Sequence, residues 1–132
     1  MLLRIELLEL CRARMDEAQL LFRKGRYDAA EYLCGYAVEF ALKARICKHL
    51  RWAGYPSTDA EFKGKRDFKV HDFDCLLEFT GLASKVHSNC SSEWFTVTDW
   101  SPDLRYRPIG SSTRQHAQEL LDASKVLLKK LC

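Results

Sequence analysis

The chain has 132 residues, of which 30% are charged and 47% hydrophobic, so it is long enough to bury a core and too apolar to be a disordered tail. Its net charge of +3 permits an anionic partner but lacks the strong basic bias of dedicated nucleic-acid modules. No uncharged stretch could span a bilayer. Arg4, Glu6 and Glu9 interrupt the apolar N-terminus, where a secretory signal would be continuous. We therefore expect one cytoplasmic domain over residues 1–132, without membrane contact.

The first half of the chain predicts two long helices. Apolar side chains recur at helical spacing over residues 2–24, at Leu8, Cys11, Met15, Ala18 and Phe22. Gly25 follows as a C-terminal cap. Asp28 and Glu31 have the spacing of a capping box at the start of a second helix, which we expect over about residues 29–51. The short turn between them predicts an antiparallel hairpin.

One face of the second predicted helix carries unusually small side chains. Its stripe consists of Ala30, Cys34, Ala37, Ala41 and Ala44. Small side chains at a contact allow a neighbouring helix to come close. Gly35 costs about 1 kcal/mol of helix propensity relative to Ala, so we expect it at such a close approach.

The second half predicts shorter elements. Residues 52–70 form the longest irregular stretch, and Asp72 is the expected N-cap of a short helix. Another helix is expected over about 84–97, and a last one begins near Ser111 or Ser112. No strand alternation is recognisable. The sequence therefore predicts an all-α, up-and-down antiparallel bundle of four to five helices.

The usual catalytic signatures are absent, since the chain has no Gly-rich phosphate loop, HExxH, GxSxG or CxxC. Without a signal peptide, the six cysteines are expected to be reduced. Two His/Cys pairs, His71 with Cys75 and His87 with Cys90, have spacings that a zinc site could use. We prefer to place Cys75 and Cys90 in the core and expect no metal.

Two charged constellations remain as candidate sites. Glu39 and Lys43 form an i, i+4 pair beside the small-residue stripe. If that carboxylate is covered, it needs a cationic partner, which Lys43 or an arginine of residues 105–107 could supply. Arg105 and Arg107 flank Tyr106 and offer forked donors for a phosphate and a ring for a base.

Both constellations also have structural interpretations. Arg105 could tie its loop to helix carbonyls or to Glu39, and Tyr106 could pack on Trp94 or Trp100. A basic run also follows the second helix, with two aromatic residues interleaved: Lys63, Lys65, Arg66 and Lys69, with Phe62 and Phe68. Charge runs in loops are usually solvated, which is how we interpret this one.

Residues 28–46, DAAEYLCGYAVEFALKARI, resemble the second helix of HEPN (higher-eukaryote and prokaryote nucleotide-binding) domains. The family pattern A-x-E-x-A-L-K-A falls at residues 37–44. The preceding turn at residues 25–30 is similar to the family's inter-helix turn. Residues 71–76 resemble its His-Asp-Leu helix start, and residues 104–106 its Arg-Tyr loop before the last helix.

This resemblance implies a helical bundle from a prokaryote, commonly a homodimer, often paired with a small nucleotidyltransferase in toxin–antitoxin systems. It implies no cofactor. Catalytically active members are metal-independent ribonucleases with an R-x4-6-H motif near the last helices. In that motif the histidine acts as acid and base, and the arginine stabilises the phosphorane.

The ribonuclease motif is missing at its expected place. The positions where its histidine should follow Arg105 or Arg107 hold Gly, Ser, Thr and Arg. His116 lies too far along the chain. A formal R-x4-H occurs at Arg66 and His71, but it crosses the irregular stretch.

The preferred hypothesis is therefore a non-catalytic HEPN-like module that binds a nucleotide, RNA or a nucleotidyltransferase-type partner. Its groove would be lined by Glu39, Lys43, His71, Asp72, Arg105, Tyr106 and Arg107. The alternative is a metal-independent ribonuclease toxin that uses His71 with Arg66 or Arg105. A structural dimer without a ligand is a third possibility.

Overall fold

The computed structural model describes residues 1–132 and confirms the all-α class. In chain order its elements are β1 (Leu2–Leu3), α1 (Arg4–Arg23), α2 (Tyr27–Leu50), β2 (Gly54–Tyr55), η1 (Arg66–Phe68), α3 (Phe73–Phe79), α4 (Ala83–Asn89), α5 (Ser91–Val97), η2 (Pro102–Tyr106) and α6 (Arg114–Leu131), where η marks a 3-10 helix. None of the helices combines the length and the apolar character needed to cross a membrane.

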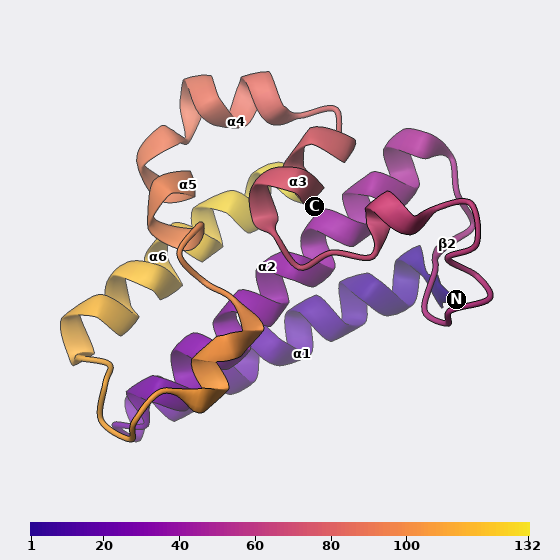
Figure 1. The fold of residues 1–132 in the computed structure, drawn as a ribbon. Helices are drawn as coiled ribbons and strands as arrows, with labels where there is room; N and C mark the ends of the chain where they lie inside the picture. Colours follow the sequence, from indigo (N-terminus) through magenta and orange to yellow (C-terminus); the bar gives the residue numbers. More distant parts are fainter.

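The predicted antiparallel hairpin is formed by α1 and α2, which lie side by side along the molecule (Figure 1). Gly25 turns the chain between them with a φ of +75°, a conformation that favours glycine. The short helices α3, α4 and α5 then carry the chain back. As a result α6 runs in the same general direction as α2 (Figure 1). Helix α2 contacts α1, α6, α3, β2 and η2, so it is the central element.

The hydrophobic core is one cluster of 27 buried residues drawn from all six helices, β2 and the connecting segments. Its centre is the small-residue stripe of α2, where Cys34, Ala37 and Ala41 are fully buried. From α6, Leu127 and Leu131 reach this cluster, and Cys34 Sγ lies 3.1 Å from Ser124 Oγ. The predicted stripes of the two long helices and of α6 thus face one another.

Gly35 marks a close approach, as expected, but the neighbour is not a helix. A Cβ added to Gly35 would lie 1.9 Å from Cε2 of Trp100, inside the indole ring. Trp100 is 5% exposed and stacks on Phe73, with ring centroids 5.3 Å apart. The missing side chain of Gly35 therefore makes room for the indole of Trp100 between α2 and the segment before η2.

Three details of the predicted fold are wrong. Leu2 and Leu3 pair antiparallel with Tyr55 and Gly54, so α1 begins at Arg4 and the fold has a two-stranded sheet. Such a sheet is too short to give alternation in the sequence. The helix expected over 84–97 is broken at Cys90, whose φ and ψ of −136° and 34° leave the helical region. The bundle thus has six α-helices, and the last begins at Arg114, with Thr113 as its N-cap.

The cysteine interpretation is half right. Cys90 is 1% exposed and lies in the core, whereas Cys75 lies on the exposed side of α3. Helix α3 begins after Asp72, which accepts a hydrogen bond from the Cys75 backbone N–H as an N-cap should. The structure contains no group of three or more His, Cys, Asp or Glu residues placed to hold a metal ion.

Candidate functional site

Two buried carboxylates lie on one face of α2, on either side of Trp100. Glu31, Gly35 and Glu39 are spaced by four residues and so follow one another along that face. Glu31 is 1% exposed and Glu39 is 2% exposed. Because a buried charge is costly without partners, each carboxylate must be bound by donors from elsewhere in the chain.

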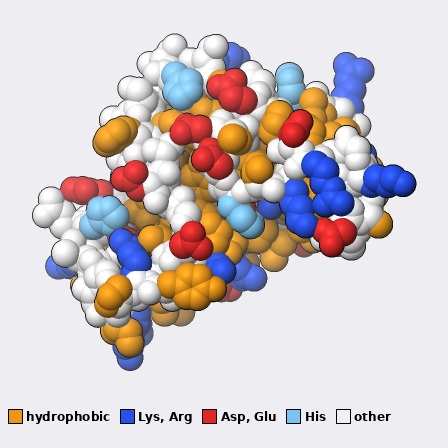
Figure 2. Space-filling model, viewed as in Figure 1, with side chains coloured by type: hydrophobic (Ala, Val, Ile, Leu, Met, Phe, Trp, Pro, Cys, Tyr) orange, Lys and Arg blue, Asp and Glu red, His pale blue; other side chains and the backbone are white.

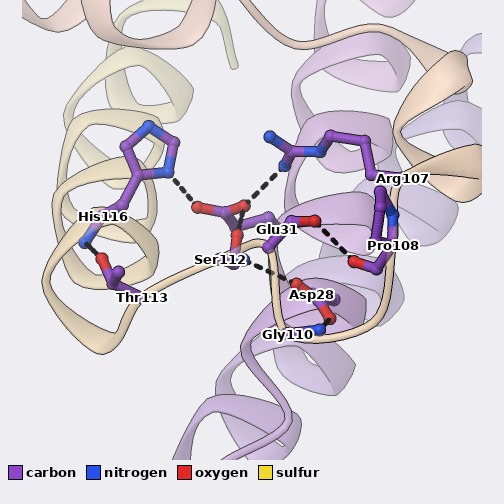
Figure 3. Close-up of polar contacts among 9 residues, drawn as sticks. Asp28, Glu31, Arg107, Pro108, Gly110, Ser112, Thr113 and His116 are labelled. Atoms are coloured by element: carbon purple, nitrogen blue, oxygen red, sulfur yellow. Dashed lines mark hydrogen bonds and ion pairs between the residues drawn. The ribbon is translucent and has the colours of Figure 1, made fainter.

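Glu31 binds three side chains that precede or begin α6 (Figure 3). Arg107 Nη2 lies 3.1 Å from Oε2, and the hydroxyl of Ser112 donates to the same oxygen. His116 Nδ1 contacts the other oxygen, Oε1. Arg107 and His116 are 42% and 53% exposed, so both side chains have one side on the carboxylate and the other in solvent.

Asp28, one turn before Glu31, holds the backbone of the same loop (Figure 3). Its carboxylate accepts hydrogen bonds from the N–H groups of Gly110 at 2.6 Å and Ser112 at 2.8 Å. These two bonds lower the pKa of Asp28 below its ordinary value of 3.8. The predicted capping box is therefore wrong, because α2 begins at Tyr27 and both carboxylates bind the loop instead.

The orientation of His116 is determined by Glu31 and by the start of α6. Thr113 Oγ1 accepts the His116 backbone N–H at 3.1 Å, which places His116 in the first turn. An ionised carboxylate only accepts hydrogen bonds, so Nδ1 is the donor to Glu31. In the neutral ring this leaves Nε2 with its lone pair. Figure 3 shows the second ring nitrogen pointing away from Glu31.

Arg107 and His116 border a small cavity of about 140 Å³, together with Glu31 and Trp100. A guanidinium and an imidazole held side by side at a cavity are suited to binding a phosphate oxygen. The same pair could also move a proton at that oxygen, since imidazole can act as acid and base. We call Glu31, Arg107, Ser112 and His116 the Glu31 cluster.

Glu39 obtains its partners in a different way. Lys43 Nζ lies 3.3 Å from Oε2, one helical turn along α2, and His71 Nδ1 lies 2.5 Å from Oε1. The covered carboxylate thus has the cationic partner expected from Lys43, and His71 takes the place proposed for an arginine. Lys43 is mostly buried and also lies 5.2 Å from the ring centroid of Tyr55.

A larger cavity of about 450 Å³ opens beside His71. It is lined by Tyr36, His71, Asp72, Phe73, Thr98, Asp99, Trp100, Ser101, Pro102, Asp103 and Arg105. The cavity brings together three of the predicted binding residues, His71, Asp72 and Arg105. Three carboxylates line it together with one guanidinium and one imidazole, so the cavity is poorly suited to a phosphate. Asp99 and Trp100 lie between this cavity and the smaller one, because both residues line each of them.

Arg105, Tyr106 and Arg107 have different surroundings and do not line one common groove. Arg105 donates to the Pro102 carbonyl at 3.0 Å, as a structural interpretation expected, and not to Glu39. Tyr106 is 73% exposed and carries the Arg105 guanidinium over its ring, so the expected packing on Trp94 or Trp100 is wrong. Arg107 belongs to the Glu31 cluster. The predicted groove is therefore divided.

The sequence spacing excludes His116 from an R-x4-6-H motif with either arginine. The structure overturns this geometric argument, since Arg107 and His116 bind the same carboxylate. For the alternative pair, Arg66 forms its ion pair with Asp59 at 4.0 Å, whereas Arg105 lines the same cavity as His71. A signal for the missed cluster existed in the sequence. Glu31 interrupts a buried small-residue stripe, as Glu39 does, and so also requires a cation.

The fold and the cluster define an all-helical protein with histidine–carboxylate sites at its central helix. The family model for the HEPN domain matches residues 6–58, which include most of α1 and all of α2. This match confirms the predicted resemblance to HEPN domains over residues 6–58, and Glu31 and Glu39 lie within the matched segment. Searches among curated proteins and among solved structures returned no match.

Proposed function

We propose that this HEPN-like protein binds single-stranded RNA, with a phosphate held by Arg107 and His116. The observation that supports this proposal most strongly is the binding of both side chains to one buried carboxylate. Glu31 limits the motion of the two donors, and their exposed sides remain available to an anion. The larger cavity beside His71, with its three carboxylates, would then border the RNA but not hold its phosphates.

Binding of a labelled single-stranded RNA, measured by fluorescence anisotropy, tests this proposal. We expect Arg107→Ala to weaken binding about tenfold, the cost of one charged hydrogen-bonding contact. Arg105→Ala is the matched control, because Arg105 lies two residues away and donates to the Pro102 carbonyl, outside the Glu31 cluster. Loss of binding in Arg105→Ala alone would contradict the proposal and move the site to the larger cavity. Circular dichroism spectra of both variants check that the fold is retained.

The Glu31–His116 contact favours RNA cleavage as a second candidate function. A histidine oriented through Nδ1 has its Nε2 free to take the proton of a ribose 2′-hydroxyl. The 2′-oxygen would then attack the adjacent phosphorus, and the bond to the 5′-oxygen of the next nucleotide would break as His116 returns the proton to that leaving oxygen. Arg107 would stabilise the charge on the phosphoryl oxygens. The products would be a 2′,3′-cyclic phosphate and a 5′-hydroxyl.

Incubation of RNA with the protein in EDTA distinguishes the two functions. Cleavage that persists in EDTA and disappears in His116→Ala would support catalysis by the Glu31 cluster. His71→Ala is the matched control, because His71 has the same kind of carboxylate partner but belongs to the other cavity. If the wild-type protein binds RNA and leaves it intact, the non-catalytic module is supported. The predicted homodimer and nucleotidyltransferase partner stay predictions.

A further inference from the structure

The positive charge of this protein is concentrated at one end. Residues 48–69 contain six Lys and Arg and three Asp and Glu residues, a surplus of three that equals the net charge of the whole chain. The six cations are Lys48, Arg51, Lys63, Lys65, Arg66 and Lys69, and we call them the basic end. Figure 2 shows Lys and Arg side chains gathered over η1 and the C-terminal end of α2.

Most of this charge is not neutralised within the chain. Lys69 and Arg66 share one carboxylate, that of Asp59, at 2.5 and 4.0 Å. Lys48, Arg51, Lys63 and Lys65 form no ion pair. Glu61, the second acidic residue of the segment, is bound by the amino group of Met1 at 2.6 Å. Its carboxylate therefore does little to offset the neighbouring cations.

The aromatic residues of the segment explain why the cations are presented outward. Phe62 is 7% exposed and Phe68 packs against the core, so the two aromatic residues interleaved with the basic run anchor it. Trp52 lies partly exposed beneath Lys65, whose Nζ is 5.6 Å from the ring centroid. Arg51, Trp52 and Lys65 line an open cavity of about 470 Å³. Cations around an aromatic ring suit a strand of phosphates and bases.

We infer that the basic end is a second RNA-binding surface, which contacts phosphates of the same strand that the Glu31 cluster holds. This inference rests on the proposed function. The two surfaces lie toward opposite ends of α2. Glu31 and Arg51 are 20 residues apart, which corresponds to about 30 Å along the helix. Only an RNA long enough to cover that distance can contact both surfaces.

The test compares a trinucleotide with a 20-nucleotide RNA of mixed sequence. We expect the wild-type protein to bind the longer RNA at least tenfold more tightly at low salt. The triple variant Lys63→Gln, Lys65→Gln, Arg66→Gln should lose this advantage and leave trinucleotide binding unchanged. For this variant, the slope of log affinity against log salt concentration should be shallower by about 2 than for the wild-type protein. Each of the three lost phosphate contacts accounts for roughly 0.7 of the slope on a single strand. The matched control replaces Lys85, Lys129 and Lys130, three exposed lysines outside the basic end, by Gln.

The outcomes separate this inference from the proposed function. If the triple variant keeps the length advantage and the salt slope of the control, the inference is wrong, whatever Arg107→Ala does. If the triple variant loses both and Arg107→Ala binds normally, the proposed site fails, and the basic end binds RNA without the Glu31 cluster. Equal affinity and salt slope for a polyglutamate chain of matched charge would also overturn the inference, because they would indicate an acidic protein as the partner.

Discussion

The two buried glutamates of α2 have the same kinds of partner but obtain them from different parts of the chain. Glu39 takes Lys43 from its own helix and His71 from the segment before α3. Glu31 takes its partners from residues 76 to 85 positions later in the sequence. One carboxylate is thus partly satisfied as soon as α2 forms, whereas the other depends entirely on the docking of α6 and the loop before it.

This difference shows how one helix face can carry two sites of unequal character. Lys43 is held close to Glu39 by helix geometry and covered by its neighbours, so that contact is chiefly structural. The donors on Glu31 are about half exposed, which leaves them able to bind a ligand as well. The histidine is about half exposed in both sites, so the two sites differ in the second cation: Lys43 is 16% exposed, whereas Arg107 is 42% exposed.

The largest effect is expected at Gly35, which separates the two glutamates. Gly35→Ala places a Cβ inside the Trp100 ring and should disturb both sites at once. We expect the free energy of unfolding to fall by about 2 kcal/mol, because overpacking costs more than the gain in helix propensity. Urea denaturation measures this change. In a Trp100→Ala background the same substitution should cost nothing, and additive costs in the double variant would contradict the assignment.

A smaller effect is expected when either buried glutamate is replaced, and it compares what the two carboxylates contribute to the free energy of unfolding. Glu31→Gln keeps the volume of the side chain but removes the charge that three donors share, and it should cost about 1.5 kcal/mol. Glu39→Gln serves as its matched control and should cost about 1 kcal/mol, because Glu39 has two donors. Both values come from urea denaturation at neutral pH. Equal costs, or a reversed order, would show that the number of donors does not determine the contribution.

The smallest effect is expected at Asp28, which binds the loop of the Glu31 cluster and has no counterpart beside Glu39. Its lowered pKa means that the ionised carboxylate stabilises the folded state above pH 3.8, and that this contribution is lost as the pH falls through the lowered folded-state value. Asp28→Asn should therefore cost about 0.5 kcal/mol at neutral pH, since the partly exposed amide still accepts one N–H bond.

Thermal unfolding of Asp28→Asn and the wild-type protein between about pH 2.5 and 7 measures this effect. The gap between the two melting temperatures should be constant above about pH 5 and should close below pH 3.8. A gap that is unchanged at the acidic end would mean that the charge of Asp28 does not hold the loop.

The parts of the fold that local pattern determines could be predicted. The α1–α2 hairpin follows from periodicity and Gly25, and the start of α3 follows from Asp72 as N-cap. The β1–β2 pairing and the break at Cys90 could not be predicted, because neither leaves a pattern longer than two residues. Gly35 was predicted to mark a close approach, but its neighbour, Trp100, is 65 positions away in sequence.

For the candidate site too, the contacts between residues close in sequence could be predicted, whereas the contacts between distant segments could not. Glu39 and Lys43 could be paired from the sequence because they are four residues apart on one helix. The Glu31 cluster was missed because Asp28 and Glu31 also fit the spacing of a capping box, which is a local alternative. Counting residues between Arg107 and His116 failed as well, because the turn held by Asp28 folds the intervening loop back on itself.

The wide sequence separation within the Glu31 cluster also has a consequence for biosynthesis. On the ribosome, α1 and α2 are complete long before Arg107, Ser112 and His116 have been translated. Until they arrive, the Glu31 carboxylate must stay hydrated, because burial without donors is unfavourable. A nascent chain that terminates early would therefore keep one face of α2 open to chaperones and proteases. Translation of α6 both closes the hydrophobic core and completes the Glu31 cluster, so the two are acquired together.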